Sequence, residues 1–217
     1  MRPEAIASTT ALWRGRTGPL AQGVSSAVDT VNRFGSLASI PPAPQNGATY
    51  PGSTLGKVLK NTAQLIRSNI GARVITIDQG DWDMHVGLGT TDWGDMQRNA
   101  GDLADSLAAF MQDLGALTTQ VTVVTVSEFG RRVVQNGAGG LDHGYGNCML
   151  LLGGGVRGGE VHGRWPGLGA ANLVDGDLRV TRDYRSVFAE IVSARFPEVS
   201  VPAVFPDFAP EIVGAII

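Results

Sequence analysis

Five acidic and imidazole side chains in this sequence stand where they could share a metal ion. Asp83 and His85 are two residues apart, so in extended backbone their side chains point the same way. Asp142 and His143 form a second pair, and Glu128 follows an apolar run almost directly. Mixed carboxylate and imidazole ligands suit Zn²⁺ or Mn²⁺ better than Mg²⁺ or Ca²⁺, which favour all-oxygen shells. The alternative for the acidic segment around Asp83 is a solvated turn without an ion.

Three apolar runs are placed to carry these side chains to one edge of a sheet. Val121–Val126 is β-branched at every position, which favours a strand covered on both faces. Ala72–Ile77 and Asn147–Gly153 are predicted as further strands, one just before the acidic segment and one shortly after His143. Ligand sites in open α/β sheets lie at the carboxyl ends of strands, so we expect Glu128 at such an edge.

Four segments have the apolar spacing or the capping residues of helices. They are a helix within Gly18–Leu37, one from Ser53 or Thr54 to Gly71, one over Asp95–Leu117, and one capped by Thr181 or Asp183 and closed by Pro197. A hairpin is predicted over Asn172–Val180, with its turn at Asp175–Asp177.

The order of these elements predicts the fold class. Helices alternate with strands that end in acidic loops, which is typical of an α/β protein with a largely parallel sheet. Residues 36–51 are rich in proline and are expected to form a loop. We therefore divide the chain into an irregular N-terminal segment with a Pro-rich loop, residues 1–52, and a core, residues 53–217.

Composition excludes several classes of protein. A net charge of −3 gives no reason to expect nucleic acid or an anionic membrane as a partner. No apolar run approaches the roughly 20 residues of a membrane span, and Met1–Arg16 lacks the apolar region of a signal peptide. The single cysteine, Cys148, excludes an internal disulfide and lies in an apolar run, so we expect it in the core.

A glycine-rich segment after the third predicted strand resembles a nucleotide-binding motif. Gly153–Gly158 matches the dinucleotide fingerprint G-x-G-x-x-G, but the fingerprint requires a helix to begin at its third glycine. The continuation to Gly167 contains three further glycines and a proline and cannot be a helix. We therefore reject dinucleotide binding, and we expect His162 in this segment to be a loop residue and not a ligand.

Several segments taken together resemble the bacterial domain-of-unknown-function family 1501. They appear in that family's order and cover the chain from about residue 72 to the C-terminus: QGDWDMH, VTVVTVSEFGRR, NGAGGLDHG, LLGGGVRGG, GRWPGL, TRDYRSVFAEIV and VFPDF. The family is similar to the alkaline phosphatase and sulfatase superfamily, whose fold is a three-layer α/β/α sandwich around a metal site. The resemblance thus implies a three-layer α/β/α sandwich with a largely parallel sheet, incomplete at its N-terminus.

The resemblance also implies roles for individual residues. Asp83, His85 and His143 would bind one ion. Glu128 would bind a second ion, at the position after the strand where the superfamily usually has an aspartate. Asp142 would be a ligand or would orient His143 from behind. Arg131 would face an anionic group of the substrate. The glycine that usually precedes the Trp-Asp pair is Asp81 in this chain.

Two classes of function follow from the resemblance. The superfamily takes its nucleophile from a strand near the N-terminus, and no such strand is predicted before residue 72, so we expect the chain to be the C-terminal part of a longer hydrolase. It would then belong to a metal-dependent hydrolase of small phosphate or sulfate esters, inactive without that strand. The alternative is a non-catalytic metal-binding or structural module of the cell envelope. Family members carry a twin-arginine export signal, which implies the periplasm or cell surface.

Overall fold

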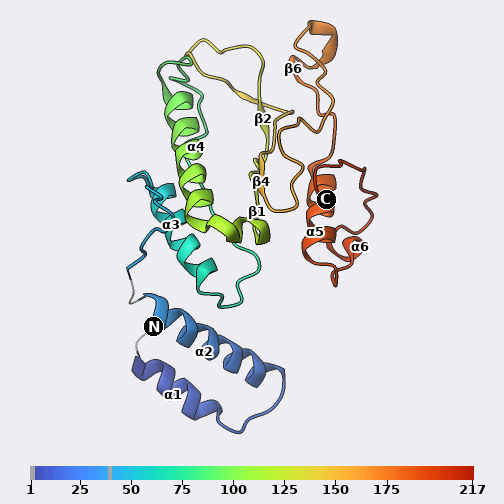
Figure 1. Ribbon diagram of the computed structural model, residues 1–217. Helices are drawn as coiled ribbons and strands as arrows, with labels where there is room; N and C mark the ends of the chain where they lie inside the picture. The colour runs from blue at the N-terminus through green and yellow to red at the C-terminus, as the bar shows by residue number, and fades with distance from the viewer. Residues whose placement is uncertain (1–2, 39–40) are drawn as a thin grey trace.

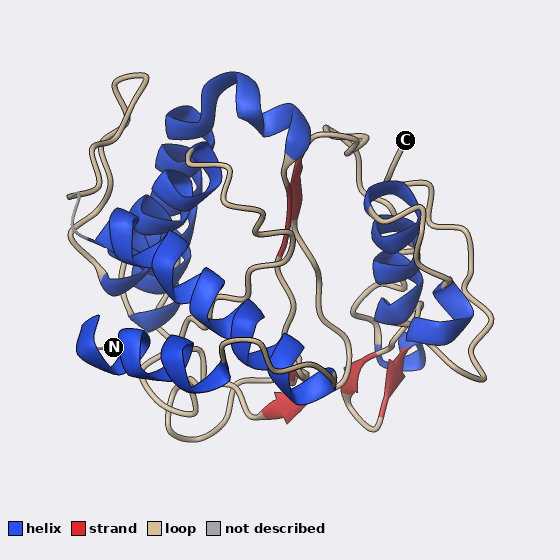
Figure 2. Cartoon of the chain, turned by 90° about the horizontal axis from the view of Figure 1, so that it is seen from below, coloured by secondary structure: helices blue, strands red, loops and turns tan. Residues whose placement is uncertain are grey.

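The structure is a computed structural model that describes residues 3–38 and 41–217. Helices make up most of its regular structure, and its strands are short (Figure 2). Two helices, α1 (Pro3–Trp13) and α2 (Pro19–Ala38), form a hairpin at the N-terminus (Figure 1). The helix predicted within Gly18–Leu37 is confirmed by α2, whereas α1 was not predicted. The division at residue 52 stays a prediction, and residues 39–40 of the predicted loop lie outside the described residues.

The main core lies between α3 (Thr54–Arg67) and α4 (Asp95–Leu114). Its fully packed members are apolar residues at helical spacing on the facing sides of the two helices: Leu55, Leu59, Ala63, Leu107, Phe110 and Leu114. Ser53 caps α3 as predicted, because its hydroxyl accepts a hydrogen bond from the N–H of Gly56 at 3.0 Å. The predicted end at Gly71 is wrong by a few residues, since α3 ends at Arg67.

A buried carboxylate ties the Pro-rich loop to this helix pair. Asp113 is fully buried, and it accepts hydrogen bonds from the N–H of Gln45 at 2.7 Å and the hydroxyl of Tyr50 at 2.9 Å. Arg67 forms an ion pair with the same carboxylate. Burial and the contact with Asp113 together raise the pKa of Tyr50 well above its usual value. The loop therefore has a defined position despite its prolines.

The predicted three-layer sandwich with a largely parallel sheet is wrong. The described strands form three two-stranded sheets, and all three pairs are antiparallel. The pairs are β1 (Thr122–Val124) with β4 (Leu151–Gly153), β2 (Gly130–Arg131) with β3 (His143–Gly144), and β5 (Leu173–Val174) with β6 (Asp177–Leu178). An apolar run predicts extended backbone, but pairing is decided by what lies beside it in space.

Two of the three predicted core strands are shortened, and one does not form. Ala72–Ile77 belongs to no strand and to no helix. Val121–Val126 and Asn147–Gly153 are reduced to three residues each, β1 and β4. Cys148 lies outside the shortened β4 and is exposed, so its predicted place in the core is wrong.

The C-terminal part packs on the far side of β1 and β4 from α4 (Figure 1). Its main helix, α5 (Tyr184–Arg195), is capped by Asp183 as predicted, and a short helix, α6 (Val201–Val204), follows. The hairpin predicted over Asn172–Val180 is confirmed by β5 and β6. Two short 3₁₀ helices, η1 (Gly115–Gln120) and η2 (Ala170–Asn172), complete the elements. Among the residues described, no helix has both the length and the apolar character that crossing a bilayer requires.

Candidate metal centre

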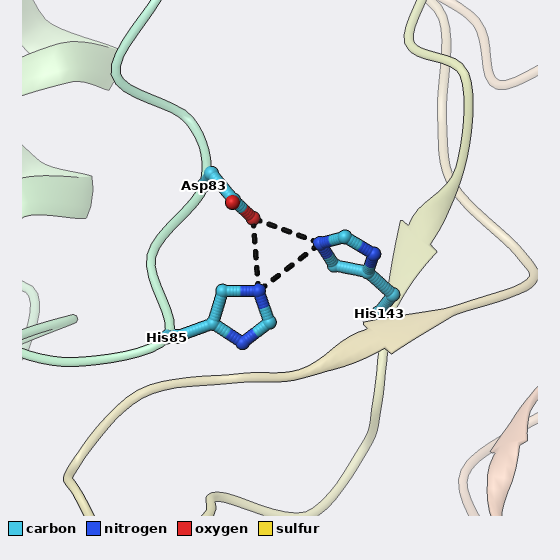
Figure 3. Close-up of side chains that lie close together, drawn as sticks. All are labelled: Asp83, His85 and His143. Atoms are coloured by element: carbon cyan, nitrogen blue, oxygen red, sulfur yellow. Dashed lines mark hydrogen bonds and ion pairs between the residues drawn. The ribbon is translucent and has the colours of Figure 1, made fainter.

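Three side chains from two distant segments converge on one point (Figure 3). Oδ1 of Asp83 lies 3.0 Å from Nε2 of His85 and 2.8 Å from Nε2 of His143. The two Nε2 atoms are 3.1 Å apart, which closes a triangle of potential ligand atoms. Asp83 and His85 come from the loop before α4, and His143 comes from β3.

A carboxylate behind His85 sets the tautomer of its ring. Nδ1 of His85 lies 2.7 Å from Oδ1 of Asp142, so we assign the proton to Nδ1, which donates to the carboxylate. Nε2 of neutral His85 then carries a lone pair directed at the triangle. A hydrogen bond of this kind from the second ring nitrogen to a carboxylate is typical of metal-binding histidines.

Both carboxylates are held in the ionised form that a metal ligand needs. Hydrogen bonds from His143 and then from Arg131 lower the pKa of Asp83 to about 2. Hydrogen bonds from His85 and then from Asn136 lower the pKa of Asp142. At neutral pH the triangle therefore contains an ionised carboxylate, and a proton on Nε2 of His143 would link it to His85 without an ion. A divalent cation would replace that proton.

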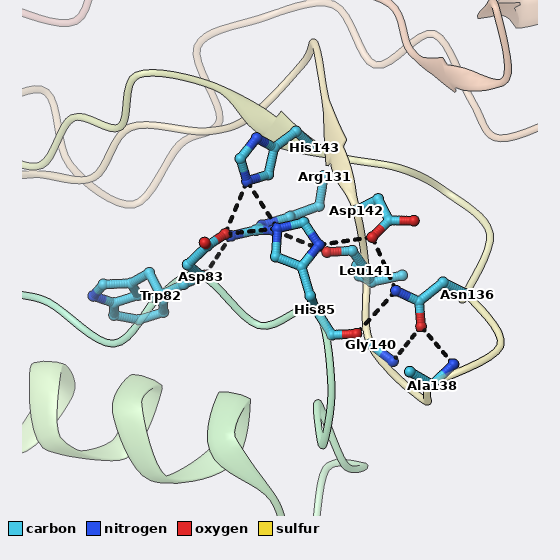
Figure 4. Close-up of polar contacts among 10 residues, drawn as sticks. All are labelled: Trp82, Asp83, His85, Arg131, Asn136, Ala138, Gly140, Leu141, Asp142 and His143. Carbon is cyan, nitrogen blue, oxygen red and sulfur yellow. Dashed lines mark hydrogen bonds and ion pairs between the residues drawn. The ribbon is translucent and has the colours of Figure 1, made fainter.

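Arg131 fixes the backbone that carries Asp83 (Figure 4). Its guanidinium donates to the carbonyl of Trp82 at 2.7 Å, to the carbonyl of Leu141 at 2.9 Å and to Oδ1 of Asp83 at 2.8 Å. The group is thus engaged with the protein itself, and its side chain is only 18% exposed. That Arg131 faces an anionic substrate stays a prediction, and in the structure its guanidinium supports the segment that carries Asp83.

Asn136 joins the loop that follows β2 to the same site, and sequence reasoning missed it. Its Nδ2 donates to Oδ1 of Asp142 and to the carbonyl of His85, both at 2.9 Å. Its Oδ1 accepts from the N–H groups of Ala138 and Gly140 at 2.9 and 3.0 Å. The sequence signal was the Asn136-Gly137 pair, which predicts a turn but does not indicate what the amide contacts.

The β2–β3 pair positions His143. Arg131 and His143 are opposite each other in its register, so the supporting residue Arg131 lies beside the candidate ligand His143. The ring of Phe129 stacks on the imidazole of His143, with centroids 3.8 Å apart and planes at 26°. Gly130 and Gly144 are the other matched pair. A Cβ on Gly144 would collide with the backbone of Arg131 in β2, and a Cβ on Gly130 with the backbone of Gly146 just after β3. The two strands therefore approach closely at the site.

The acidic segment enters the site through a tight backbone turn. Asp81 has φ of 66°, in the left-handed region that favours glycine. Glycine adopts this conformation freely, whereas aspartate tolerates it only with some strain. The N–H of Met84 then bonds to the carbonyl of Trp82 at 3.0 Å, and the N–H of His85 to that of Asp83 at 3.1 Å. Asp83 and His85 thus share one side through a turn, and not through the extended strand that their spacing suggested.

Of the five predicted ligands, the structure brings three together and places a fourth behind them. One predicted role of Asp142 was to orient His143. In the structure its carboxylate contacts the ring of His85. Glu128 is exposed and lies outside the group of three. That any of these residues binds metal stays a prediction. His162, expected to be a loop residue, donates a hydrogen bond from Nε2 to the carbonyl of Arg157 at 2.8 Å, away from the triangle.

The residues present fit a four-coordinate ion. Ligand atoms at about 2.1 Å from a tetrahedral ion lie about 3.4 Å apart, a few tenths of an ångström more than the sides of this triangle. The three side chains are between 43% and 66% exposed, so a fourth ligand can reach the ion from solvent.

Comparison with known proteins places these residues in a family. A family model described as "Protein of unknown function (DUF1501)" matches residues 62–185, more than half of the chain. The chain belongs to the DUF1501 family. The matched part contains the triangle, Asp142, Asn136 and Arg131. No curated protein and no solved structure matches this DUF1501 chain.

Proposed function

We propose that Asp83, His85 and His143 of this DUF1501 protein bind one divalent ion, and that the site hydrolyses a small phosphate or sulfate ester. The observation that carries the proposal is the convergence of three potential ligand atoms within 2.8–3.1 Å of one another. The hydrogen bond from His85 to Asp142 supports it, because it directs a lone pair at the same point.

The donor set favours Zn²⁺ or Mn²⁺. Two imidazole nitrogens and one carboxylate oxygen are ligands that Zn²⁺ uses in catalytic sites, where three protein ligands leave a further position open. Mg²⁺ and Ca²⁺ prefer oxygen ligands, which this triangle does not supply in sufficient number. Glu128 was predicted on a second ion. Since it lies outside the group of three, the proposal here is for a single ion.

Each supporting residue has a defined task in this proposal. An ion bound here would act as a Lewis acid toward an ester oxygen. Asp142 keeps the proton on Nδ1 of His85, Arg131 holds the Trp82–Asp83 backbone, and Phe129 fixes the ring plane of His143. The exposure of the triangle leaves room for a substrate to approach from solvent.

A non-catalytic metal-binding or structural module is the second candidate. It is favoured by the contacts of Arg131, whose donors are engaged with two carbonyls and Asp83 and so do not face a substrate anion. This module would keep the ion for structure or for assembly with a partner. Turnover by the metal-loaded protein would favour the hydrolase over this module.

Metal content tests the site, and the third histidine supplies a matched control. We expect about one equivalent of Zn²⁺ or Mn²⁺ per chain by mass spectrometry, and loss of that metal in His85→Ala and in His143→Ala. His162→Ala removes a histidine outside the triangle and should retain the metal. Well-folded protein that stays metal-free after reconstitution would contradict the site.

Turnover tests the reaction separately. Metal-loaded protein is assayed with p-nitrophenyl phosphate and p-nitrophenyl sulfate. Hydrolysis that His143→Ala abolishes and His162→Ala retains supports the hydrolase. One bound ion without turnover of either ester fits the non-catalytic module, and it fits equally a hydrolase that is inactive without the N-terminal strand expected from the resemblance.

A further inference from the structure

A large cavity separates α3 and α4 from α5, and it has a volume of about 2090 Å³. Apolar side chains from both sides line most of it, among them Leu103, Leu107 and Phe110 of α4 and Phe188, Ile191 and Val192 of α5. β1 and the segment Ala72–Ile77 also border it. The cavity is open to solvent, and apolar surface left uncovered on this scale is typical of an interaction site.

Two lengths of backbone in the cavity have unused hydrogen-bonding groups. Within the described residues, no backbone N–H or C=O of 72–77 takes part in a hydrogen bond. β1 pairs with β4 along one edge only. Bonds from Gly154 to Val121 and from Thr125 to Leu150 show that the odd-numbered residues face β4. The N–H and C=O groups of Thr122 and Val124 therefore face the cavity.

Helices lie on both faces of β1, with α3 and α4 on one face and α5 on the other. Val121 and Val123 pack against the α3–α4 core, whereas the hydroxyl of Thr122 accepts a hydrogen bond from Nε of Arg195 in α5 at 2.7 Å. A strand added beside β1 would thus direct alternate side chains into the two layers. Apolar residues on both faces of that strand are required, because the lining on both sides is apolar.

We propose that this cavity binds an extended, apolar strand of a different polypeptide, which pairs with the free edge of β1 and covers Ala72–Ile77. Unpaired strand edges are docking sites for extended peptides, in which main-chain hydrogen bonds supply affinity and side-chain pockets supply specificity. This cavity can supply both, because it has a free strand edge and an apolar lining. Val74 and Val126, which are 73% and 56% exposed, would be covered by such a strand.

A second copy of this chain is a poor source for the strand. Three of its apolar extended runs, at 72–77, 121–126 and 148–152, border this cavity themselves. Its C-terminal tail is anchored, since the carboxylate of Glu190 accepts hydrogen bonds from the N–H groups of four consecutive residues, 213–216. Residues 3–38 are largely helical. The described chain therefore has no free apolar strand to donate.

The cavity extends to Asp83 and His143. A strand docked along β1 therefore ends beside the triangle, and its terminal residues lie close to the candidate metal centre. The strand site stands on the cavity and the free edge alone, so it holds whether or not the triangle binds an ion.

A phage-displayed library of random octapeptides tests the proposal against the full chain. We expect enrichment of β-branched and aromatic sequences, with binding of the synthetic peptides measured by calorimetry. N-methylation at alternate residues keeps the side chains but removes the donors, and it should weaken binding at least about tenfold if main-chain bonds to β1 form. Metal-free protein is used, so that a failed metal site does not affect the result.

Hydrogen exchange locates the bound peptide. The amides of Thr122 and Val124 and those of 72–77 should exchange more slowly in the complex, while those of α1 stay unchanged. Val124→Pro removes one donor at the free edge and should weaken binding, and Val134→Pro, at an exposed valine outside the cavity, should not. No enrichment, equal binding of the N-methylated peptides, or protection elsewhere would overturn the proposal. A dimer that already protects these amides would show that a second copy is the occupant.

Discussion

Nδ1 of His85 lies 2.7 Å from Oδ1 of Asp142, and the two residues are 57 positions apart in the chain. This contact joins the loop before α4 to the start of β3, so the two halves of the candidate metal centre are held together by the site's own side chains. The same carboxylate accepts a hydrogen bond from Asn136. Any ion in the triangle would therefore depend on residues that do not touch it.

Replacing Asp142 should weaken metal binding without removing a ligand. We expect Asp142→Ala to reduce the affinity for Zn²⁺ by about 10- to 100-fold, because the ring of His85 loses its orienting acceptor. Asp142→Asn keeps an acceptor oxygen and should have a smaller effect. Competition with a zinc chelator measures both. Asp78→Asn changes an exposed carboxylate of the same acidic segment and is the control. Equal affinities for all three variants would contradict the role of Asp142.

Replacing Asn136 should destabilise the loop between β2 and β3. Asn136→Ala removes the acceptor for the N–H groups of Ala138 and Gly140 and the donor to Asp142. We expect a loss of about 1–3 kcal/mol in the free energy of unfolding, measured by urea denaturation. Gln135→Ala, at an exposed neighbouring position, should change stability by less than about 0.5 kcal/mol. A stability as high as that of the unmodified protein would show that the loop holds its shape without Asn136.

The free energy of unfolding should decrease as the pH is lowered below 4.5, and Glu190 should contribute to this decrease. Partial burial acts to raise the pKa of Glu190, but hydrogen bonds from the backbone of Gly214, Val213, Ala215 and Ile216 together outweigh it, and the pKa is lowered from 4.5. A lowered pKa in the folded state adds stability above the unfolded pKa, and that stability is lost as the pH falls through the folded pKa.

The Glu190→Gln variant isolates this contribution. It should be less stable than the unmodified protein at pH 7, and the difference should shrink as the pH falls below 4.5, where Glu190 of the folded protein takes up its proton. Thermal unfolding of both proteins at several pH values measures the difference. A difference that is the same at all pH values would mean that the charge of Glu190 has no part in holding the C-terminal tail.

Removing the buried carboxylate of Asp113 should be among the most damaging single changes. Asp113→Ala leaves Arg67, whose side chain is only 13% exposed, without its counter-ion and leaves the hydroxyl of Tyr50 without an acceptor. We expect a loss of about 3–5 kcal/mol in the free energy of unfolding. Tyr50→Phe removes one hydrogen bond and should cost about 1 kcal/mol. Asp105→Ala, at an exposed position of α4, is the control for both in urea denaturation. A loss of less than 1 kcal/mol for Asp113→Ala would show that water replaces the carboxylate.

Helices were largely predictable, whereas the sheet was not. The caps Ser53 and Asp183 and the apolar stripe of α4 mark helices whose backbone bonds close within four residues, so local sequence suffices. Ala72–Ile77 has the composition of a buried strand, but a strand needs a partner from elsewhere in the chain. The described residues supply none there, and a parallel sheet does not form.

The ligand residues were predicted and their connections were not. Residue type and spacing selected five candidates, Asp83, His85, Glu128, Asp142 and His143, because carboxylates and imidazoles in short, turn-rich segments stand out in a sequence. The family resemblance then grouped Asp83, His85 and His143 around one ion. Which carboxylate lies behind which ring cannot be found this way. Asp142 is adjacent to His143 in sequence, yet it contacts His85, because the pairing of β2 with β3 directs neighbouring residues to opposite sides.

The amino-acid sequence by itself determined the family, the main helices with their caps, the β5–β6 turn and the candidate ligands. These depend on contacts between residues close in the chain, or on residue identity alone. Tertiary structure decided the antiparallel pairing of β1 with β4, the supporting roles of Arg131 and Asn136, and the cavity beside β1. Each of these joins segments many residues apart, and their relative positions are set by the packing of whole elements and not by local preference.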